Sequence, residues 1–308
     1  MRSSMSRTTR ATVLLAALAI SVLNLSGCAA SNEPTPTASS DGKLHVVASI
    51  SNWADIAKQI GGDYVDVTSI ISDPNKDPHS YEATPRDQLA VDKADLVIVN
   101  GNGYDDFATK MVAASDNKNK MFNIFTSVHW GTLMTKAPNQ HIWFNLAITN
   151  QASQALAKKF EAMDPSNASI YQANQEAFSA ALGKVIDTAA SLAKITKGYK
   201  YFATEPIAND LLNSAGFVDQ TPKAFSDAIE NETDVPPATM QASLEMIKSK
   251  QIDYLVLNQQ TSNAQVEKLV SAAREASVKT VSFSELLPEN TTYIAWMTAN
   301  LKTLNPGM

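Results

Sequence analysis

Three side chains that could bind a metal ion stand at predicted strand-to-helix corners of the chain. His79 lies in the polar loop 77–85, His141 lies in the polar turn 139–141, and Glu205 follows the apolar run 201–203. Open α/β sheets place ligand-binding groups at the carboxyl ends of their strands, and imidazole and carboxylate groups bind divalent transition metals. Because the spacing is wide, two alternatives remain: one metal site shared by the three side chains, or three ordinary polar loop residues.

Two other histidines and one cysteine complete the candidate ligands. We expect His45, on a predicted strand, to be a packed or edge residue. We expect His129 to be a loop residue, which would take the place of His141 if His141 did not bind. Cys28 is the only cysteine, so the chain has neither a disulfide framework nor a thiolate metal site.

The elements that must position these side chains alternate between strands and helices. Strands are predicted over 44–50, 65–71 and 96–100, and again over 200–203, 254–257 and 280–283. This order is typical of α/β proteins whose mostly parallel sheets are covered by helices. About thirty residues of helical pattern after Asp164 predict one long backbone helix that joins two (β/α) lobes. We therefore expect an N-terminal lobe over 43–164, the linking helix over 165–196 and a C-terminal lobe over 197–308.

The composition narrows the class of protein. The chain has 308 residues, of which 31 are acidic and 25 are basic, giving a net charge of −6. A nucleic-acid partner is not expected, because phosphate binding needs a basic surface. Apolar residues make up 44% of the chain, with 11 Gly and 13 Pro, which excludes collagen, a disordered tail protein and a multi-span membrane protein.

The N-terminus has the pattern of a targeting segment. Three arginines precede an apolar run over 11–25, which is too short for a permanent membrane span. The run ends in Leu25-Ser26-Gly27-Cys28, which looks like a bacterial lipoprotein signal. We expect residues 1–27 to be removed, Cys28 to carry a lipid anchor, and the Ser-, Thr- and Pro-rich residues 28–42 to form a disordered tether. The protein would then lie outside the cytoplasm, on the outer face of the bacterial cell membrane.

Several motifs of the folded part occur in a characteristic order. They are Val47-Ala48-Ser49-Ile50 with Trp53, Asp77-Pro78-His79-Ser80-Tyr81-Glu82 with Thr84-Pro85, Ala94-Asp95-Leu96-Val97-Ile98-Val99-Asn100-Gly101, His141-Ile142-Trp143, Asp164-Pro165, and Phe283-Ser284-Glu285-Leu286-Leu287-Pro288 with Tyr293 and Trp296-Met297. From about residue 43 to residue 304 the chain resembles the bacterial zinc- and manganese-binding lipoproteins that serve as substrate-binding components of ABC metal importers.

The resemblance implies a metal site between two lobes joined by a backbone helix. By position, His79 and His141 match the two histidines of the first lobe, and Glu205 matches the third ligand of the manganese-type members. The fourth position departs from the family, because the stretch 258–263 has no carboxylate where an Asp is usual. Water, a side-chain oxygen of Asn263 or Ser262, or the second oxygen of Glu205 could fill it.

The metal implied by the resemblance is Zn(II) or Mn(II). Two imidazoles, one carboxylate and a solvent ligand make an acceptable zinc site, whereas manganese, a harder ion, prefers a second carboxylate. The His-rich loop of many zinc members is also missing from residues 72–77. These two absences favour different metals.

The sequence thus predicts a monomeric binding protein that captures a divalent metal and delivers it to an ABC permease. One alternative is a siderophore or corrinoid binder on the same scaffold, which would need no protein ligands to a metal. Another is a zinc hydrolase, since three ligands plus water also form a hydrolytic site. Because no general base or nucleophile motif is recognisable, we expect no enzymatic activity.

Overall fold

Two four-stranded parallel sheets form the framework of the chain in a computed structural model that describes residues 42–131, 139–230 and 233–306. The first sheet has the order β2-β1-β3-β4 and the second has the order β6-β5-β7-β8. The strands are β1 (Leu44–Ile50), β2 (Val65–Ile71), β3 (Leu96–Val99), β4 (Met121–Asn123), β5 (Lys200–Ala203), β6 (Val218–Asp219), β7 (Tyr254–Asn258) and β8 (Lys279–Phe283). The predicted fold class, two (β/α) lobes with parallel sheets, is confirmed.

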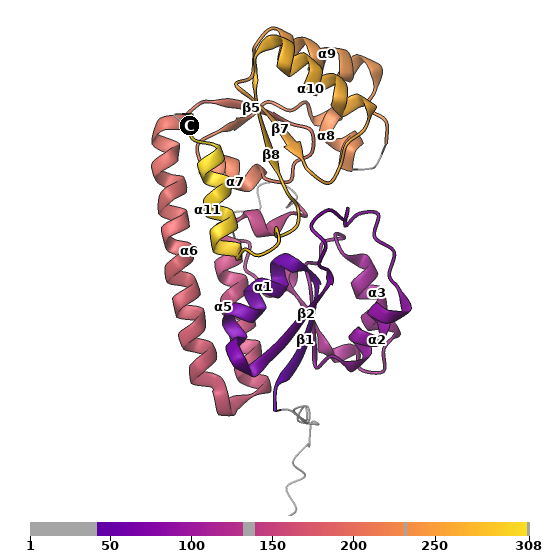
Figure 1. Cartoon of the computed structure of the whole chain (residues 1–308), viewed down its shortest axis with the longest axis vertical. Helices are drawn as coiled ribbons and strands as arrows, with labels where there is room; N and C mark the ends of the chain where they lie inside the picture. The colour runs from indigo at the N-terminus through magenta and orange to yellow at the C-terminus, as the bar shows by residue number, and fades with distance from the viewer. Residues whose placement is uncertain (1–41, 132–138, 231–232, 307–308) are drawn as a thin grey trace, which may run out of the picture. The chain divides into compact units, whose positions relative to one another are not determined.

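Helices flank both sheets and connect their strands (Figure 1). In the first half they are α1 (Ser51–Gly61), α2 (Pro85–Lys93), α3 (Asp106–Ala114), α4 (Ile124–Ser127) and α5 (Leu146–Met163). In the second half they are α7 (Asn209–Ser214), α8 (Lys223–Glu230), α9 (Pro237–Lys248), α10 (Ala264–Ala276) and α11 (Tyr293–Thr303). Helix α2 begins with a capping box formed by Thr84 and Asp87, with Pro85 in the first turn.

The apolar runs of the sequence become the central strands of the sheets. All four residues of β3 are buried, and only the second residue of β1 is partly exposed. Side chains buried on both faces are expected of parallel strands that helices cover on both sides. The register aligns Val46 with Leu96 in the first sheet and Tyr201 with Tyr254 in the second. The carboxyl ends of the strands in each sheet therefore lie at one edge.

The 29-residue helix α6 (Ala168–Thr196) connects the two halves. At 1.5 Å per residue it is about 43 Å long. It packs against α1 and α5 of the first half and against α7 and α11 of the second, and Figure 1 shows it running past both groups. The predicted long backbone helix is confirmed.

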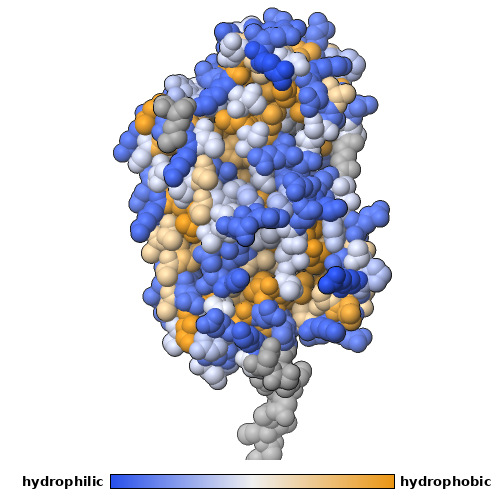
Figure 2. Space-filling model, in the orientation of Figure 1, coloured by the Kyte–Doolittle hydropathy of each residue, from blue (hydrophilic) through white to orange (hydrophobic). Residues whose placement is uncertain are grey.

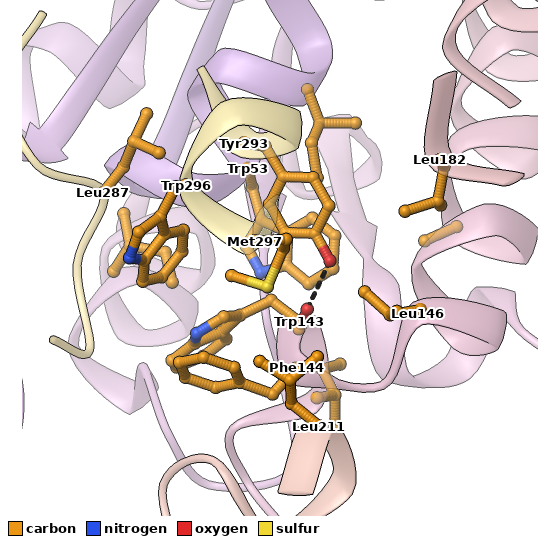
Figure 3. Packing of buried hydrophobic residues seen from close by; sticks show 14 of the residues in the cluster. Trp53, Trp143, Phe144, Leu146, Leu182, Leu211, Leu287, Tyr293, Trp296 and Met297 are labelled. Atoms are coloured by element: carbon orange, nitrogen blue, oxygen red, sulfur yellow. Dashed lines mark hydrogen bonds between the residues drawn. The ribbon is translucent and has the colours of Figure 1, made fainter. Parts of the chain in front are cut away.

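One cluster of buried apolar side chains includes residues from both halves. Trp143 and Phe144 of the first half lie beside Tyr293 and Trp296 of α11 (Figure 3). The rings of Phe144 and Trp296 have centroids 5.4 Å apart, and the Tyr293 hydroxyl donates a hydrogen bond to the Trp143 carbonyl oxygen. Helix α11 follows the last strand of the second half, but through this shared core it packs against the first half.

The exposed surface is mixed in character. In the view of Figure 2, hydrophobic side chains form small patches between hydrophilic ones. Among the residues that the structure describes, no helix combines the length and the apolar character that a membrane crossing requires.

Candidate metal centre

Four side chains from both halves of the chain converge at the carboxyl edges of the two sheets. His79, His141, Glu205 and Glu285 each offer one ligand atom, and these four atoms all lie within 4.8 Å of one another. Glu285 Oε2 is 3.4 Å from His79 Nε2 and 3.3 Å from His141 Nε2. Glu205 Oε1 is 3.7 Å from His79 Nε2 and 3.9 Å from His141 Nε2. This donor set is suited to a divalent transition metal.

Each of the four side chains occupies a turn beyond a strand or before a helix. His79 lies in the loop between β2 and α2, where its backbone N–H donates to Asp77 Oδ1 at 2.9 Å. His141 directly precedes a 3-10 turn over Ile142–Phe144. Glu205 and Glu285 are each the second residue after a strand, β5 and β8 respectively. The ends of parallel strands therefore position the two carboxylates, as expected of open α/β sheets.

His141 is held so that one ring nitrogen faces the other ligands. Its Nδ1 atom is 2.7 Å from Asn139 Oδ1, which also accepts the backbone N–H of His141 at 2.9 Å. With Nδ1 as donor, the lone pair of the buried Nε2 atom is left without a hydrogen-bond donor. Asn139 also donates to the Pro206 carbonyl of the second half, and Asn100 donates to the Gln140 carbonyl at 2.9 Å. Such outer partners fix the tautomer and orientation of a metal-binding imidazole.

Asn258 connects the two carboxylates. Its Nδ2 atom donates to Glu205 Oε2 at 2.7 Å and to Glu285 Oε1 at 2.6 Å. Thr261 also donates to Glu205 Oε2, at 2.7 Å, and the buried Tyr104 hydroxyl donates to Glu285 Oε2 at 2.9 Å. These donors turn one oxygen of each carboxylate towards the imidazoles.

The backbone of Glu285 is held by a residue of the first half. Asn52, which is fully buried in α1, donates from Nδ2 to the Glu285 carbonyl oxygen at 2.8 Å. Its Oδ1 atom accepts the Leu287 N–H, also at 2.8 Å. In addition, Gln260 accepts the Glu285 N–H at 2.9 Å. Glu285 is therefore tied to both halves of the chain.

The negative charge of the carboxylates shifts the protonation of the centre. Burial by itself lowers the pKa of His79, but the hydrogen bond to Glu285 and the charges of Glu285 and Glu205 outweigh burial and raise the pKa to about 9. Burial raises the pKa of Glu285, but the interactions with the facing imidazoles of His141 and His79 outweigh burial and hold the pKa well below its usual range. Without a metal, a proton on His79 thus balances part of the carboxylate charge.

A cavity of about 460 Å³ opens onto the centre. His79, His141 and Glu205 line it together with Glu230 and other side chains of both halves. The His79 side chain keeps 26% of its surface exposed, whereas Glu285 is fully buried. An ion arriving from solvent would therefore meet His79 first.

The remaining candidates of the sequence lie outside the group of four. Asn263 lines the cavity, but its Oδ1 atom caps α10 by accepting two backbone N–H groups at 2.9 and 3.0 Å. The Ser262 hydroxyl donates to Glu267 at 2.8 Å. His129 is exposed, and His45 faces Asp66 at 3.5 Å on β1.

Glu285 is the member of the group of four that the sequence does not predict among the candidate ligands. It lies within the motif Phe283-Ser284-Glu285 at the end of a predicted strand. The position after a strand, which singled out Glu205, is the signal that also identifies Glu285. The stretch 258–263 instead contributes Asn258 and Thr261 as hydrogen-bond donors to the carboxylates.

The fold and the four converging side chains define a two-lobed protein with a candidate site for a divalent metal between its sheets. The chain belongs to the family described as zinc-uptake complex component A, periplasmic, whose sequence model matches residues 46–307.

Curated relatives agree with this membership, and a solved structure shares the fold. The chain is 26% identical to the manganese ABC transporter substrate-binding lipoprotein scaA of Streptococcus gordonii, over 96% of this chain and 97% of that protein. It is 32% identical to the iron ABC transporter substrate-binding lipoprotein MtsA of Streptococcus pyogenes serotype M1, over 74% and 75%. The periplasmic zinc-binding protein TroA from Treponema pallidum has a similar fold, with a TM-score of 0.73, 19% identity, and coverage of 85% of this chain and 98% of that one.

Proposed function

We propose that this protein captures a divalent transition-metal ion, Zn(II) or Mn(II), outside the cytoplasm and delivers it to the permease of an ABC importer. The observation that carries the proposal is the convergence of two imidazoles and two carboxylates, whose ligand atoms lie within 4.8 Å of one another. Family membership supports it, and so do the names of the relatives, which are substrate-binding lipoproteins of metal ABC transporters.

The four side chains have distinct tasks in binding. His141 offers Nε2, because its Nδ1 atom is engaged by Asn139. His79 binds through Nε2 only after it loses its proton, since a protonated imidazole has no free lone pair. Glu205 and Glu285 together balance the charge of a divalent cation, which makes capture of a dication favourable at this partly buried place.

The second carboxylate bears on which ion is captured. Two imidazoles and two carboxylates are adequate for zinc in a four-coordinate site. Glu285 also supplies the additional oxygen ligand that a harder ion such as manganese prefers. Both metals therefore remain candidates for the transported ion.

The same proposal covers the anchor, the location and the partners. Residues 1–27 would be a lipoprotein signal peptide, and Cys28 would carry the lipid that holds the protein at the outer face of the cell membrane by the tether 28–42. These segments lie outside the described residues, apart from residue 42. The protein would act as a monomer, with the permease as its partner and without enzymatic turnover.

Metal titration of histidine variants tests the central proposal. Purified protein is stripped with a chelator and titrated separately with Zn(II) and Mn(II), alongside His79→Ala and His141→Ala. His129→Ala is the matched control, because it removes an exposed imidazole outside the group of four. We expect binding in the micromolar range or tighter in the parent protein and the control, and its loss in the two other variants. Binding of neither metal, which an organic-ligand binder would show, would refute the proposal, and so would unchanged binding in His79→Ala and His141→Ala.

The anchor has a separate test. Replacement by Cys28→Ser should abolish incorporation of labelled fatty acid and release the protein from the membrane fraction. Labelling of the Cys28→Ser variant would contradict the assignment of the lipid to this cysteine.

A further inference from the structure

The two oxygens of Glu205 have different surroundings. Oε1 faces the imidazoles of His79 and His141, at 3.7 and 3.9 Å. Oε2 accepts two hydrogen bonds of 2.7 Å each, one from Asn258 Nδ2 and one from the Thr261 hydroxyl. A carboxylate oxygen has two lone-pair positions, so Oε2 is fully engaged by the protein itself.

Glu285 is engaged differently. Apart from the contact with His79, each of its two oxygens accepts one hydrogen bond, Oε1 from Asn258 and Oε2 from Tyr104. Neither oxygen has both of its lone-pair positions filled by these donors. Of the two carboxylates, therefore, only Glu205 is limited to a single coordinating oxygen. Thr261 supplies the second of the two donors that occupy its other oxygen.

The segment that holds these donors is itself fixed. Asn258 is the last residue of β7 and is 5% exposed. Its Oδ1 atom accepts the Gln260 backbone N–H at 3.0 Å, which closes a turn immediately before Thr261. The two donors are therefore presented by a short turn at the end of a buried strand.

We infer that Thr261, together with Asn258, determines metal preference by limiting Glu205 to coordination through Oε1 alone. This inference rests on the proposed function. With one atom from each of four residues, the protein supplies the tetrahedral set that zinc favours. Manganese favours oxygen-rich sites with more ligands, so the loss of a second oxygen from Glu205 disfavours manganese relative to zinc. Thr261 is a positioning residue, because it acts on the ion through Glu205.

Removal of one hydroxyl tests the inference. The variant Thr261→Val keeps the shape of the side chain and frees one lone-pair position on Glu205 Oε2. Thr261→Ser keeps the hydroxyl. Ser262→Ala is the matched control, because it removes a neighbouring hydroxyl that donates to Glu267 instead of a ligand. The dissociation constants for Zn(II) and Mn(II) are measured for the parent and all three variants, and X-ray absorption of the manganese-loaded proteins reports the number of oxygen ligands.

The ratio of the two dissociation constants, manganese over zinc, is the decisive quantity. In Thr261→Val we expect this ratio to fall about tenfold, the scale of the effect of outer partners on metal sites, with one more oxygen ligand around manganese. Thr261→Ser and Ser262→Ala should keep the ratio of the parent. An unchanged ratio in Thr261→Val, or an equal loss of affinity for both metals, would overturn the inference and leave the proposed function intact. If the parent protein bound neither metal, the proposed function would fail and the inference would fall with it.

Discussion

Raising the pH from 6.5 to 8.5 is expected to strengthen metal binding, because His79 must lose a proton before its Nε2 atom can bind an ion. The pKa of His79 is about 9 in the metal-free protein, since the carboxylates of Glu285 and Glu205 outweigh the opposing effect of burial. At pH 7 this value leaves about one neutral ring for every hundred protonated ones. Affinity should therefore rise about tenfold per pH unit, or about 100-fold over the whole range, and binding at pH 7 should release about one proton from His79.

The same pKa predicts how the metal-free protein responds to pH. Because the folded value of about 9 lies above the ordinary value of 6.5, protonated His79 stabilises the fold fully below pH 6.5. This stabilisation is lost as the pH rises through 9. The two values correspond to about 3 kcal/mol at full strength, and solvent screening of this partly exposed ring reduces the contribution to about 1–2 kcal/mol. The unfolding temperature of the metal-free protein should therefore fall between pH 6.5 and 9.

Two measurements check these expectations. Calorimetric titration at pH 7 in two buffers of different ionisation enthalpy counts the protons released per ion, and chelator competition gives the affinity at each pH. Thermal unfolding of the metal-free protein over the same range gives the stability. Binding without net proton release at pH 7, together with an affinity that is flat from pH 6.5 to 8.5, would refute the assignment of the raised pKa to His79.

Three substitutions extend the test to the elements around the centre. Replacing Glu285 with Ala removes a proposed ligand, so metal affinity should fall by more than about 100-fold, which is the upper range for residues that only support a ligand. Metal titration at pH 8 measures the affinity. An affinity within tenfold of the parent would exclude Glu285 as a ligand. Asn52→Ala leaves the Glu285 carbonyl without its side-chain donor, whereas the Leu287 N–H keeps the Ser51 hydroxyl as an acceptor, so the free energy of unfolding should fall by about 1–3 kcal/mol, and the affinity should fall as well. Tyr293→Phe removes the buried hydrogen bond to the Trp143 carbonyl, so the free energy of unfolding should fall by about 1 kcal/mol with unchanged metal affinity. Denaturant unfolding measures the stability of the last two variants, and metal titration measures their affinity. An equal loss of affinity in both would show that Asn52 does not support metal binding through Glu285.

The sequence was sufficient to predict the fold because its strongest signals come from buried elements. The runs 44–50 and 96–99 are strands buried on both faces, and α6 begins after Asp164-Pro165 with no strong breaker until residue 196. The edge strands β4 and β6 were not predicted. They have three and two residues, which is too short for a periodic pattern of buried and exposed side chains to appear.

Predicting the whole site requires the order of the strands in each sheet, which the sequence does not give. The rule that ligands follow strands points to His79 and Glu205, and the structure places them near one another and near His141. It does not say which strand ends are neighbours. In the second sheet β7 lies between β5 and β8, so Asn258 at the end of β7, just before the turn 259–263, donates to both carboxylates. The family resemblance predicts the second carboxylate in the turn after β7, but that carboxylate is Glu285, which follows β8.

The hydrogen bonds and burial of the four candidate ligands indicate which of them can move during ion exchange. Glu285 is tied to α1 through Asn52 and to the second sheet through Asn258, and it is fully buried. Wide separation of the lobes would also expose the core shared by Trp143 and Trp296, at about 25 cal/mol for each Å² of apolar surface. The loop that carries His79 is tied to the second half at Pro74, whose carbonyl accepts a hydrogen bond from Gln260 Nε2 at 2.6 Å, but the His79 side chain is more exposed than that of any other member of the group. We therefore expect entry and release of the ion to begin at the exposed His79 side chain, while His141, Glu205 and Glu285 stay together.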